Sequence, residues 1–319
     1  MTGGAPGARW TALPPAAGAG VLATGILSIG FHLTGLETVS VVTLCLAAAL
    51  WLLLAYDFSA LLLGDRRRWA ASADTPPALT AVAATTVLGA RFELLGRTPV
   101  AVALLVLAAA VWPVLLAAVL RHLTRRAPGA VFLICVATQG LAVLSALLAP
   151  EAGEWLGWVA LAFFLLGLLL YADALARFDL REVVRGAGDH WIAAGALAIS
   201  ALAASKLLAS GQWSGGAETT LRATAFVLLA LDLTGCAVLL CGELAHRRPG
   251  YDVLRWATVF PLGMTAVASL STAAATGVDG LDTLGRVVLG IAAAAWLLTA
   301  YGLGRAVRGR RGRRRGWPP

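Results

Sequence analysis

Residues 256–271 read WATVFPLGMTAVASLS, an apolar segment with a proline in its interior. The bulky Phe260 stands directly before Pro261, and the residues around this pair are small or polar, among them Gly263 and Thr265. A membrane helix tolerates a break in its backbone hydrogen bonds only where neighbouring protein or a cavity satisfies the freed groups. We therefore expect this helix to line a pore and Phe260 to plug it.

The composition places the whole chain in the membrane. Of its 319 residues 59% are hydrophobic and 13% are charged, and the mean hydropathy is +0.82. Soluble proteins carry roughly 25% charged residues. Apolar stretches of about 20 residues, the length that crosses a bilayer, recur from end to end. The sequence predicts an all-α integral membrane protein.

Ten such stretches divide the chain into an N-terminal tail (1–13), a transmembrane domain (14–306) and a basic C-terminal tail (307–319). The predicted spans are 14–36, 39–64, 77–96, 99–121, 128–149, 155–176, 190–210, 219–243, 252–275 and 283–306. Boundaries predicted in this way shift by a few residues.

The arginines give the orientation. One set of loops and the C-terminal tail hold most of them: Arg66, Arg67, Arg68, Arg121, Arg125, Arg126, Arg177, Arg181, Arg185, Arg247, Arg248, Arg255, Arg305, Arg308, Arg310, Arg311, Arg313, Arg314 and Arg315. The opposite loops hold Glu37, Glu151, Glu154, Glu218, Asp279 and Asp282, with Arg97, Arg222 and Arg286 as their basic residues. By the positive-inside rule both termini are cytoplasmic in a plasma or inner membrane.

A unit of about 60 residues recurs five times, which is typical of stacked repeats. Odd spans are rich in small and hydroxyl residues, and even spans are more apolar and carry bulky aromatics such as Trp51, Trp112 and Trp296. The repeat predicts five helical hairpins in a quasi-five-fold ring, with the odd helices inside and the even helices facing lipid.

The small residues of the odd spans have two interpretations. They leave a hollow lined by hydroxyls, or they let the helices pack closely against one another. In the first case the pore-lining residues are Thr24, Ser28, Thr85, Thr138, Ser200, Gly263 and Thr265.

Two cations lie towards the acidic-loop ends of odd spans, Arg91 in the third and Lys206 in the seventh. Ionisable groups within a membrane are functional hypotheses by default. One interpretation is that the two cations concentrate anions at an external mouth. The alternatives are that Arg91 pairs with Glu93, or that both cations reach the headgroups. A helix places Arg91 and Glu93, two residues apart, on different sides, which weakens that pairing.

Asp232 lies near mid-membrane in the eighth span, where we expect it to be hydrogen-bonded between helices and consider it a possible proton site. The chain contains no nucleophile elbow, HExxH zinc helix or phosphate loop, so an intramembrane enzyme is disfavoured. No cofactor or metal site is predicted, and arginines placed as topology signals do not indicate nucleic-acid binding.

Three segments resemble the tellurite-resistance/dicarboxylate transporter family, which includes fungal malate permeases and plant guard-cell slow anion channels. They are ATGILSIGFHL (23–33), DHWIAAGALAISALAASKLL (189–208) and WATVFPLGMTAVAS (256–269), of which the last is the most specific. The resemblance covers essentially the whole chain. It implies a trimer with one pore per protomer, and Phe260 matches the phenylalanine that occludes the family's pore. The family kinks several inner helices with prolines, whereas here only the ninth span keeps an interior one, Pro261.

The resemblance leaves the mechanism open, because the family's activities range from passive anion conduction to proton-coupled uptake. We expect an anion channel or channel-like permease that is occluded by Phe260. The alternative is a proton-coupled transporter of C4-dicarboxylates such as malate, which requires two suitably placed cations. A membrane scaffold without transport is the third class, and the interrupted ninth span argues against it.

Overall fold

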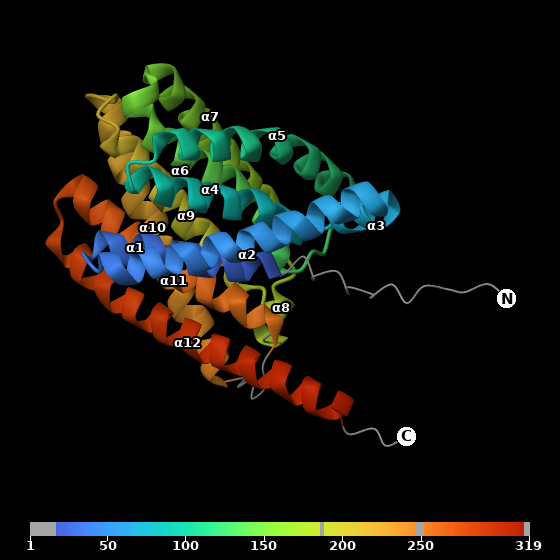
Figure 1. The fold of residues 1–319 in the computed structure, drawn as a ribbon. Coiled ribbons are helices and arrows are strands. Elements are labelled where there is room, and N and C mark those ends of the chain that lie inside the picture. Colours follow the sequence, from blue (N-terminus) through green and yellow to red (C-terminus); the bar gives the residue numbers. More distant parts are fainter. Residues whose placement is uncertain (1–16, 186–187, 246–251, 316–319) are drawn as a thin grey trace.

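The computed structural model describes residues 17–185, 188–245 and 252–315, and within these ranges it is helical without strands (Figure 1). The helices are α1 (Gly18–Leu33), α2 (Glu37–Gly64), α3 (Arg66–Ala73), α4 (Thr80–Leu94), α5 (Thr98–His122), α6 (Leu133–Ala152), α7 (Glu154–Arg177), α8 (Arg181–Arg185), α9 (Trp191–Ala209), α10 (Gly216–Ala245), α11 (Trp256–Thr276) and α12 (Asp279–Arg315). Short 3-10 turns η2 (Pro76–Leu79), η3 (Gly129–Phe132) and η4 (Val253–Arg255) precede α4, α6 and α11.

In the described part of the chain, 8 helices are long and apolar enough to cross a membrane. They are α2, α5, α6 with its preceding turn, α7, α9, α10, α11 and α12. The first and third predicted spans contain the shorter helices α1 and α4, of 16 and 15 residues. The N-terminal tail 1–13 lies outside the described residues, and α12 continues to Arg315, so the basic stretch begins as helix.

The helices form two layers that differ sharply in burial. The most apolar window of α6, α9 and α11 is 94%, 72% and 83% buried, whereas the corresponding share in α2, α5, α7, α10 and α12 is 17–28%. Most residues of α1 and α4 are also buried. The predicted alternation is confirmed: the helices of the odd predicted spans (α1, α4, α6, α9 and α11) are buried, and those of the even spans are exposed. An apolar surface of this extent on the even helices fits contact with lipid.

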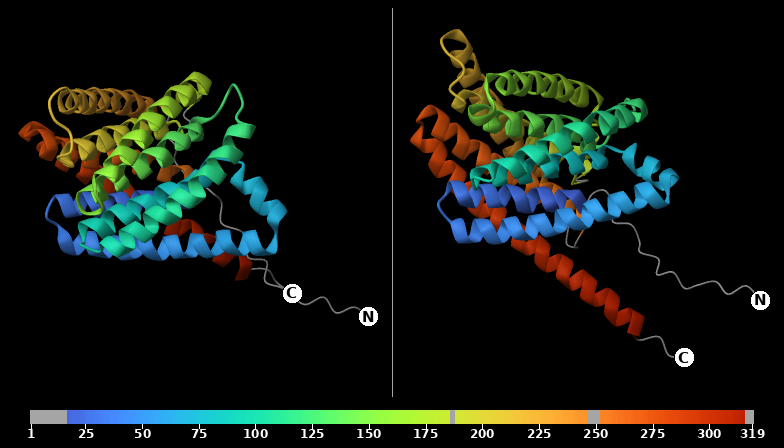
Figure 2. Two further views of the ribbon diagram at one scale, coloured as in Figure 1. Left: turned by 90° about the horizontal axis from the view of Figure 1, so that it is seen from above. Right: turned by 45° about the horizontal axis from the view of Figure 1, so that its top comes forward.

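Each buried helix pairs with the exposed helix that follows it, giving α1–α2, α4–α5, α6–α7, α9–α10 and α11–α12. Each buried helix also contacts the next buried helix, and α11 returns to contact α1, so the contacts form a closed circuit. Figure 2 shows the blue α1 and α2 side by side and the red α12 passing close to them; α12 contacts α1, although the two come from opposite ends of the sequence. The quasi-five-fold symmetry itself remains a prediction.

The hairpins sort the loops into two groups. In Figure 1 the α1–α2, α4–α5 and α11–α12 turns lie on the left, and α3 lies on the right. We call the end that carries α3, α8 and the C-terminal part of α12 the arginine-rich end. Arg247 and Arg248, which belong to the same loop set, lie outside the described residues.

A glycine lies at every contact of the circuit. The pairs are Gly25 with Val87 (α1–α4), Gly140 with Thr86 (α4–α6), Gly129 with Asp189 (before α6 and α9), Gly195 with Phe260 (α9–α11) and Gly263 with Ile26 (α11–α1). At each of them an added Cβ would lie closer than 3.0 Å to an atom of the partner residue. Glycine therefore lets the buried helices approach closely, as the packing interpretation of the small residues requires.

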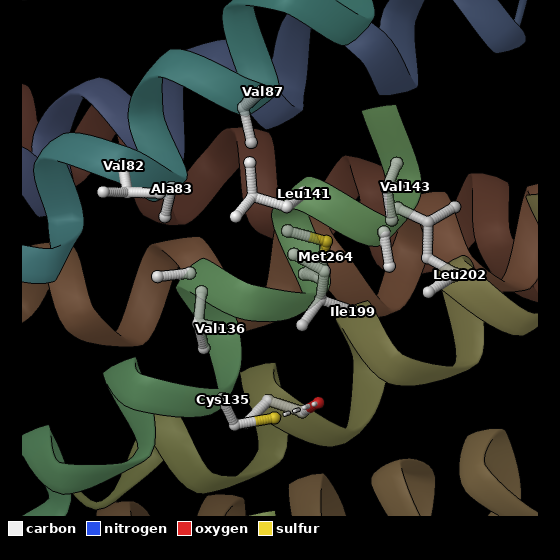
Figure 3. Close-up of a cluster of buried hydrophobic side chains, with 14 of the residues drawn as sticks. Val82, Ala83, Val87, Cys135, Val136, Leu141, Val143, Ile199, Leu202 and Met264 are labelled. Carbon is white, nitrogen blue, oxygen red and sulfur yellow. Dashed lines mark hydrogen bonds between the residues drawn. The ribbon is translucent and has the colours of Figure 1, made fainter. Parts of the chain in front are cut away.

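Apolar side chains fill the space among the buried helices. Val87 of α4, Leu141 of α6, Ile199 of α9 and Met264 of α11 belong to one cluster of buried residues (Figure 3). Leu141 and Met264 are each 0% exposed. Apolar side chains from these four buried helices thus pack into one cluster between the helices.

Candidate functional site

Phe260 lies on the second turn of α11, near the arginine-rich end, and its side chain is 1% exposed. It packs against α9 at Gly195, where a methyl group would come within 2.8 Å of the phenylalanine ring and 3.1 Å of Pro261. Pro261 has no N–H to donate to the carbonyl of Ala257, one turn earlier. The ring is therefore held between two inner helices beside a locally weakened stretch of backbone.

Five of the predicted pore hydroxyls share one local geometry: each donates to the carbonyl four residues earlier in its own helix. The bonds run from Thr24 to Gly20 (2.7 Å), Thr85 to Ala81 (2.7 Å), Thr138 to Ile134 (2.8 Å), Ser200 to Ala196 (2.7 Å) and Thr265 to Pro261 (3.0 Å). Such bonds satisfy the hydroxyl proton within the helix. What remains available is the oxygen as an acceptor.

In three hairpins an outer tryptophan occupies that acceptor. Indole Nε1 of Trp51 donates to Thr85 at 2.9 Å, that of Trp112 to Thr138 at 3.0 Å, and that of Trp296 to Thr24 at 3.0 Å. Each bond links an exposed helix to the inner helix of the next hairpin around the circuit. The indole N–H groups of these three tryptophans therefore point inward, although their helices are largely exposed.

The hydroxyls of Thr24, Thr85 and Thr138 consequently face the outer layer at these bonds. Sequence reasoning missed this contact. The signal that it overlooked is a tryptophan near the middle of each of α2, α5 and α12, which recurs with the repeat. A role for these hydroxyls in lining a lumen remains a prediction.

Asp232 takes part in the corresponding contact between α10 and α11. The Cys236 thiol lies 3.6 Å from Oδ1 of Asp232 and 3.6 Å from the Thr265 hydroxyl. Asp232 is 0% exposed, and its Oδ2 atom has no hydrogen-bond partner among the described residues. A buried carboxyl oxygen without a partner is rare in a membrane helix, and Asp232 therefore stays a candidate functional residue.

Ser28 and Arg91 belong to one polar cluster that joins α1, α2 and α4. Ser28 donates to the Ser40 carbonyl at 2.7 Å, and Nε of Arg91 donates to the Ser40 hydroxyl at 2.9 Å. Arg91 also forms an ion pair with Glu37, which accepts from His32 at 2.6 Å. The cluster ties the three helices together near the acidic-loop end.

The partner of Arg91 was not expected from the sequence. Arg91 is 0% exposed and pairs with Glu37, neither pairing with Glu93 nor reaching the headgroups. Its NH1 group is buried without a hydrogen-bond partner in the described part of the chain. Concentration of anions by Arg91 stays a prediction, and part of its charge is balanced by Glu37.

Lys206 lies in the last turn of α9 and forms no ion pair with any described acidic residue. Beside it, the hydroxyls of Ser205 and Thr272 lie 2.8 Å apart and join α9 to α11. Arg91 and Lys206 stand on α4 and α9, which are separated by α6 in the circuit. The structure thus does not place the two cations on adjacent helices.

Within the described ranges, no three His, Cys, Asp or Glu side chains gather in a way that could hold a metal ion. The site consists of hydroxyls, one unpaired lysine, a buried arginine, a buried carboxyl and an aromatic ring. Such groups can strip water from an anion and bind it weakly, which suits passage through a membrane.

Two comparisons with known proteins bear on this site. A search of curated proteins found no match. A profile of the SLAC1 family, described as voltage-dependent anion channels, matches residues 12–303. This match confirms the resemblance drawn from the three sequence segments, and it points to anion transport across a membrane. The chain therefore belongs to the SLAC1 family.

Proposed function

We propose that this protein is an anion channel of the plasma or inner membrane, whose pathway runs between the five inner helices and is closed at Phe260. The observation that carries the proposal is the closed circuit of α1, α4, α6, α9 and α11, each backed by an exposed helix. A ring of inner helices shielded from lipid is the arrangement that a single central pathway requires.

The polar groups of the inner helices support a direction along this pathway. Arg91, Lys206, Ser205 and Thr272 all lie in the last turns of their helices, towards the acidic-loop end. The apolar cluster with Met264 and the ring of Phe260 follow towards the arginine-rich end. An anion would exchange its hydration water gradually for these hydrogen-bond donors. It would then meet apolar side chains, which cannot replace the remaining water.

The gate follows from the position of the Phe260 ring. Its side chain is buried between α9 and α11, and a ring offers no hydrogen bond to an anion. Opening requires the ring to turn away from Gly195 or α9 to move away from α11. Pro261 removes one backbone hydrogen bond at this point, which makes a local change in the helix less costly.

Current through purified protein in planar bilayers tests the proposal, with chloride, nitrate and malate supplied in turn. Phe260→Ala is expected to raise anion conductance sharply above that of the wild type. Phe163→Ala is the matched control, because Phe163 packs on Trp112 in the outer layer, with ring centroids 5.4 Å apart. Equal currents in the wild type and Phe260→Ala would show that Phe260 is not the gate.

A proton-coupled transporter of C4-dicarboxylates is the second candidate, and the buried Asp232 with its unpaired Oδ2 favours it. This mechanism predicts saturable malate uptake into vesicles that depends on the pH gradient. The separation of Arg91 and Lys206 onto non-adjacent helices does not favour it, because one dicarboxylate then contacts both cations only across the ring.

The orientation and assembly belong to the same proposal. The arginine-rich end faces the cytoplasm by the positive-inside rule, and both termini lie there with the basic stretch 307–319. The protein assembles as a homotrimer with one pathway in each protomer, as its family resemblance suggests. Its small-anion permeants and the lipid bilayer are then its partners, with no nucleic acid, cofactor or metal and no catalytic activity.

A further inference from the structure

A cavity of about 370 Å³ lies outside the inner circuit, between α2, α4 and α5. Its volume falls in the range of small-molecule pockets. Six apolar residues from the two outer helices form much of its wall: Leu54, Leu61, Leu62, Leu107, Ala108 and Val111. Since α2 and α5 are largely exposed, this cavity opens towards the lipid rather than towards the axis of the protein.

The end of this cavity is formed by α3. Ser72 of α3 belongs to its lining, and Trp69 packs edge-on against the lining residue Phe58, with ring centroids 5.6 Å apart. Arg66, Arg67 and Arg68 occupy the first turn of the same helix and are exposed. With a rise of about 1.5 Å per residue, the backbone positions of Arg68 and Ser72 are only about 6 Å apart along the helix axis.

The depth of α3 matches the headgroup layer. Helix α2 has 28 residues and is therefore about 42 Å long, which exceeds the hydrocarbon thickness of about 30 Å. Its C-terminal turns and the following α3 thus reach the interface at the arginine-rich end. A tryptophan and several arginines at that depth are typical of contact with lipid headgroups.

We propose that the cavity and α3 together form a binding site for one anionic phospholipid. An acyl chain lies in the cavity against the six apolar residues, and the headgroup phosphate lies on Arg66, Arg67 and Arg68. Guanidinium groups bind phosphate oxygens in pairs, so the arginine side chains carry this contact. The backbone N–H of Arg68 at the start of α3 is already capped by the Asp65 carboxylate at 3.1 Å. Among the lining residues that the structure describes, Asp57 alone is charged, and it already has a partner within the protein.

Native mass spectrometry of the full-length protein in detergent tests the site, with phosphatidylglycerol and phosphatidylcholine as probes. The wild type is expected to retain one phosphatidylglycerol per protomer in preference to phosphatidylcholine. Changing the three arginines together (Arg66→Gln, Arg67→Gln, Arg68→Gln) is expected to reduce this preference at least tenfold, since each interfacial arginine contributes about fivefold. Ala55→Phe, which fills the cavity, is expected to weaken retention of both lipids.

The matched control removes three exposed arginines from the same end but away from the cavity: Arg181→Gln, Arg305→Gln and Arg308→Gln. It is expected to retain the bound lipid. Equal loss in the control and in the α3 variant would mean nonspecific attraction and would overturn the proposal. Unchanged lipid retention in Ala55→Phe, with a change in oligomeric mass instead, would also overturn it and would assign the cavity to a contact between copies of the chain.

Discussion

The indole N–H of Trp296 on α12 donates a hydrogen bond to the hydroxyl of Thr24 on α1, with 3.0 Å between the two heavy atoms. These residues are 272 positions apart, so this bond joins the last hairpin to the first. The bonds from Trp51 to Thr85 and from Trp112 to Thr138 repeat it between successive hairpins. The outer layer thus holds the inner circuit together through a recurring polar contact.

Breaking the contact between Trp296 and Thr24 should lower thermal stability measurably. Hydrogen bonds between membrane helices contribute about 0.6 kcal/mol on average, and at most about 1.7 kcal/mol. A double-mutant cycle of Trp296→Phe and Thr24→Val, followed by thermal unfolding in detergent, isolates this coupling. A coupling energy of zero would show that the bond does not contribute to closing the circuit.

Gly195→Ala should destabilise the protein by about 1–3 kcal/mol, as overpacking of a filled core does. The new Cβ would lie 2.8 Å from the Phe260 ring and 3.1 Å from Pro261. Adding Phe260→Ala should recover most of the lost stability, because the alanine leaves room for the methyl group. Thermal unfolding of the single and double variants measures this recovery.

The control for that experiment is Gly290→Ala on α12, where an added Cβ meets no atom within 4 Å. It should be neutral or slightly stabilising, since alanine favours a helix more than glycine does. If the effects of Gly195→Ala and Phe260→Ala on stability are additive, the two residues are not in tight contact. That result would contradict the proposed contact between the gate residue and α9.

Glu37→Gln should cost more stability than Arg91→Met. The first change leaves the fully buried guanidinium without its counter-charge, and a buried charge without a partner is strongly destabilising. The second leaves a carboxylate that is 47% exposed and still bonded to His32. Glu218→Gln is the control, because the pair between Glu218 and Arg222 is 42% exposed on both sides, and such pairs contribute less than about 1 kcal/mol. The reverse order, measured by thermal unfolding, would contradict a structural role for this pair.

Asp232→Asn tests proton coupling. Asparagine keeps an acceptor for the Cys236 thiol but cannot take up a proton, so transport should lose its dependence on pH while thermal stability changes little. Asp173→Asn serves as control, since Asp173 pairs with Arg177 at 2.9 Å near the arginine-rich end. Malate uptake into vesicles across a series of pH values measures the effect. An unchanged pH dependence in Asp232→Asn would exclude Asp232 as the proton site.

The layered architecture was accessible from the sequence because it follows from local composition. Small residues recur in one helix of each repeat and large apolar residues in the other, and this difference alone decides which helix can be shielded from lipid. The family was accessible for a similar reason, since WATVFPLGMTAVAS is a continuous segment.

The partners of individual polar groups were not accessible from the sequence. Arg91 finds Glu37 at a separation of 54 residues, and the Trp51 indole finds Thr85 at a separation of 34. Such bonds depend on the rotation of each helix about its axis, which small-residue patterns do not specify. For that reason the bonds that Thr24, Thr85 and Thr138 accept from outer tryptophans were not expected from the sequence.

The sequence by itself determined that this chain spans a membrane with buried and lipid-facing helices in alternation, and that it is a SLAC1-family protein. The length of each hydrophobic segment and the size of its residues are local properties, so the sequence shows them directly. Only the tertiary structure decided that Trp296 bonds to Thr24, that Phe260 rests on Gly195 and that a cavity lies beside α3. These features depend on contacts between segments that are distant in the sequence, and such contacts are determined by the close packing of the whole molecule.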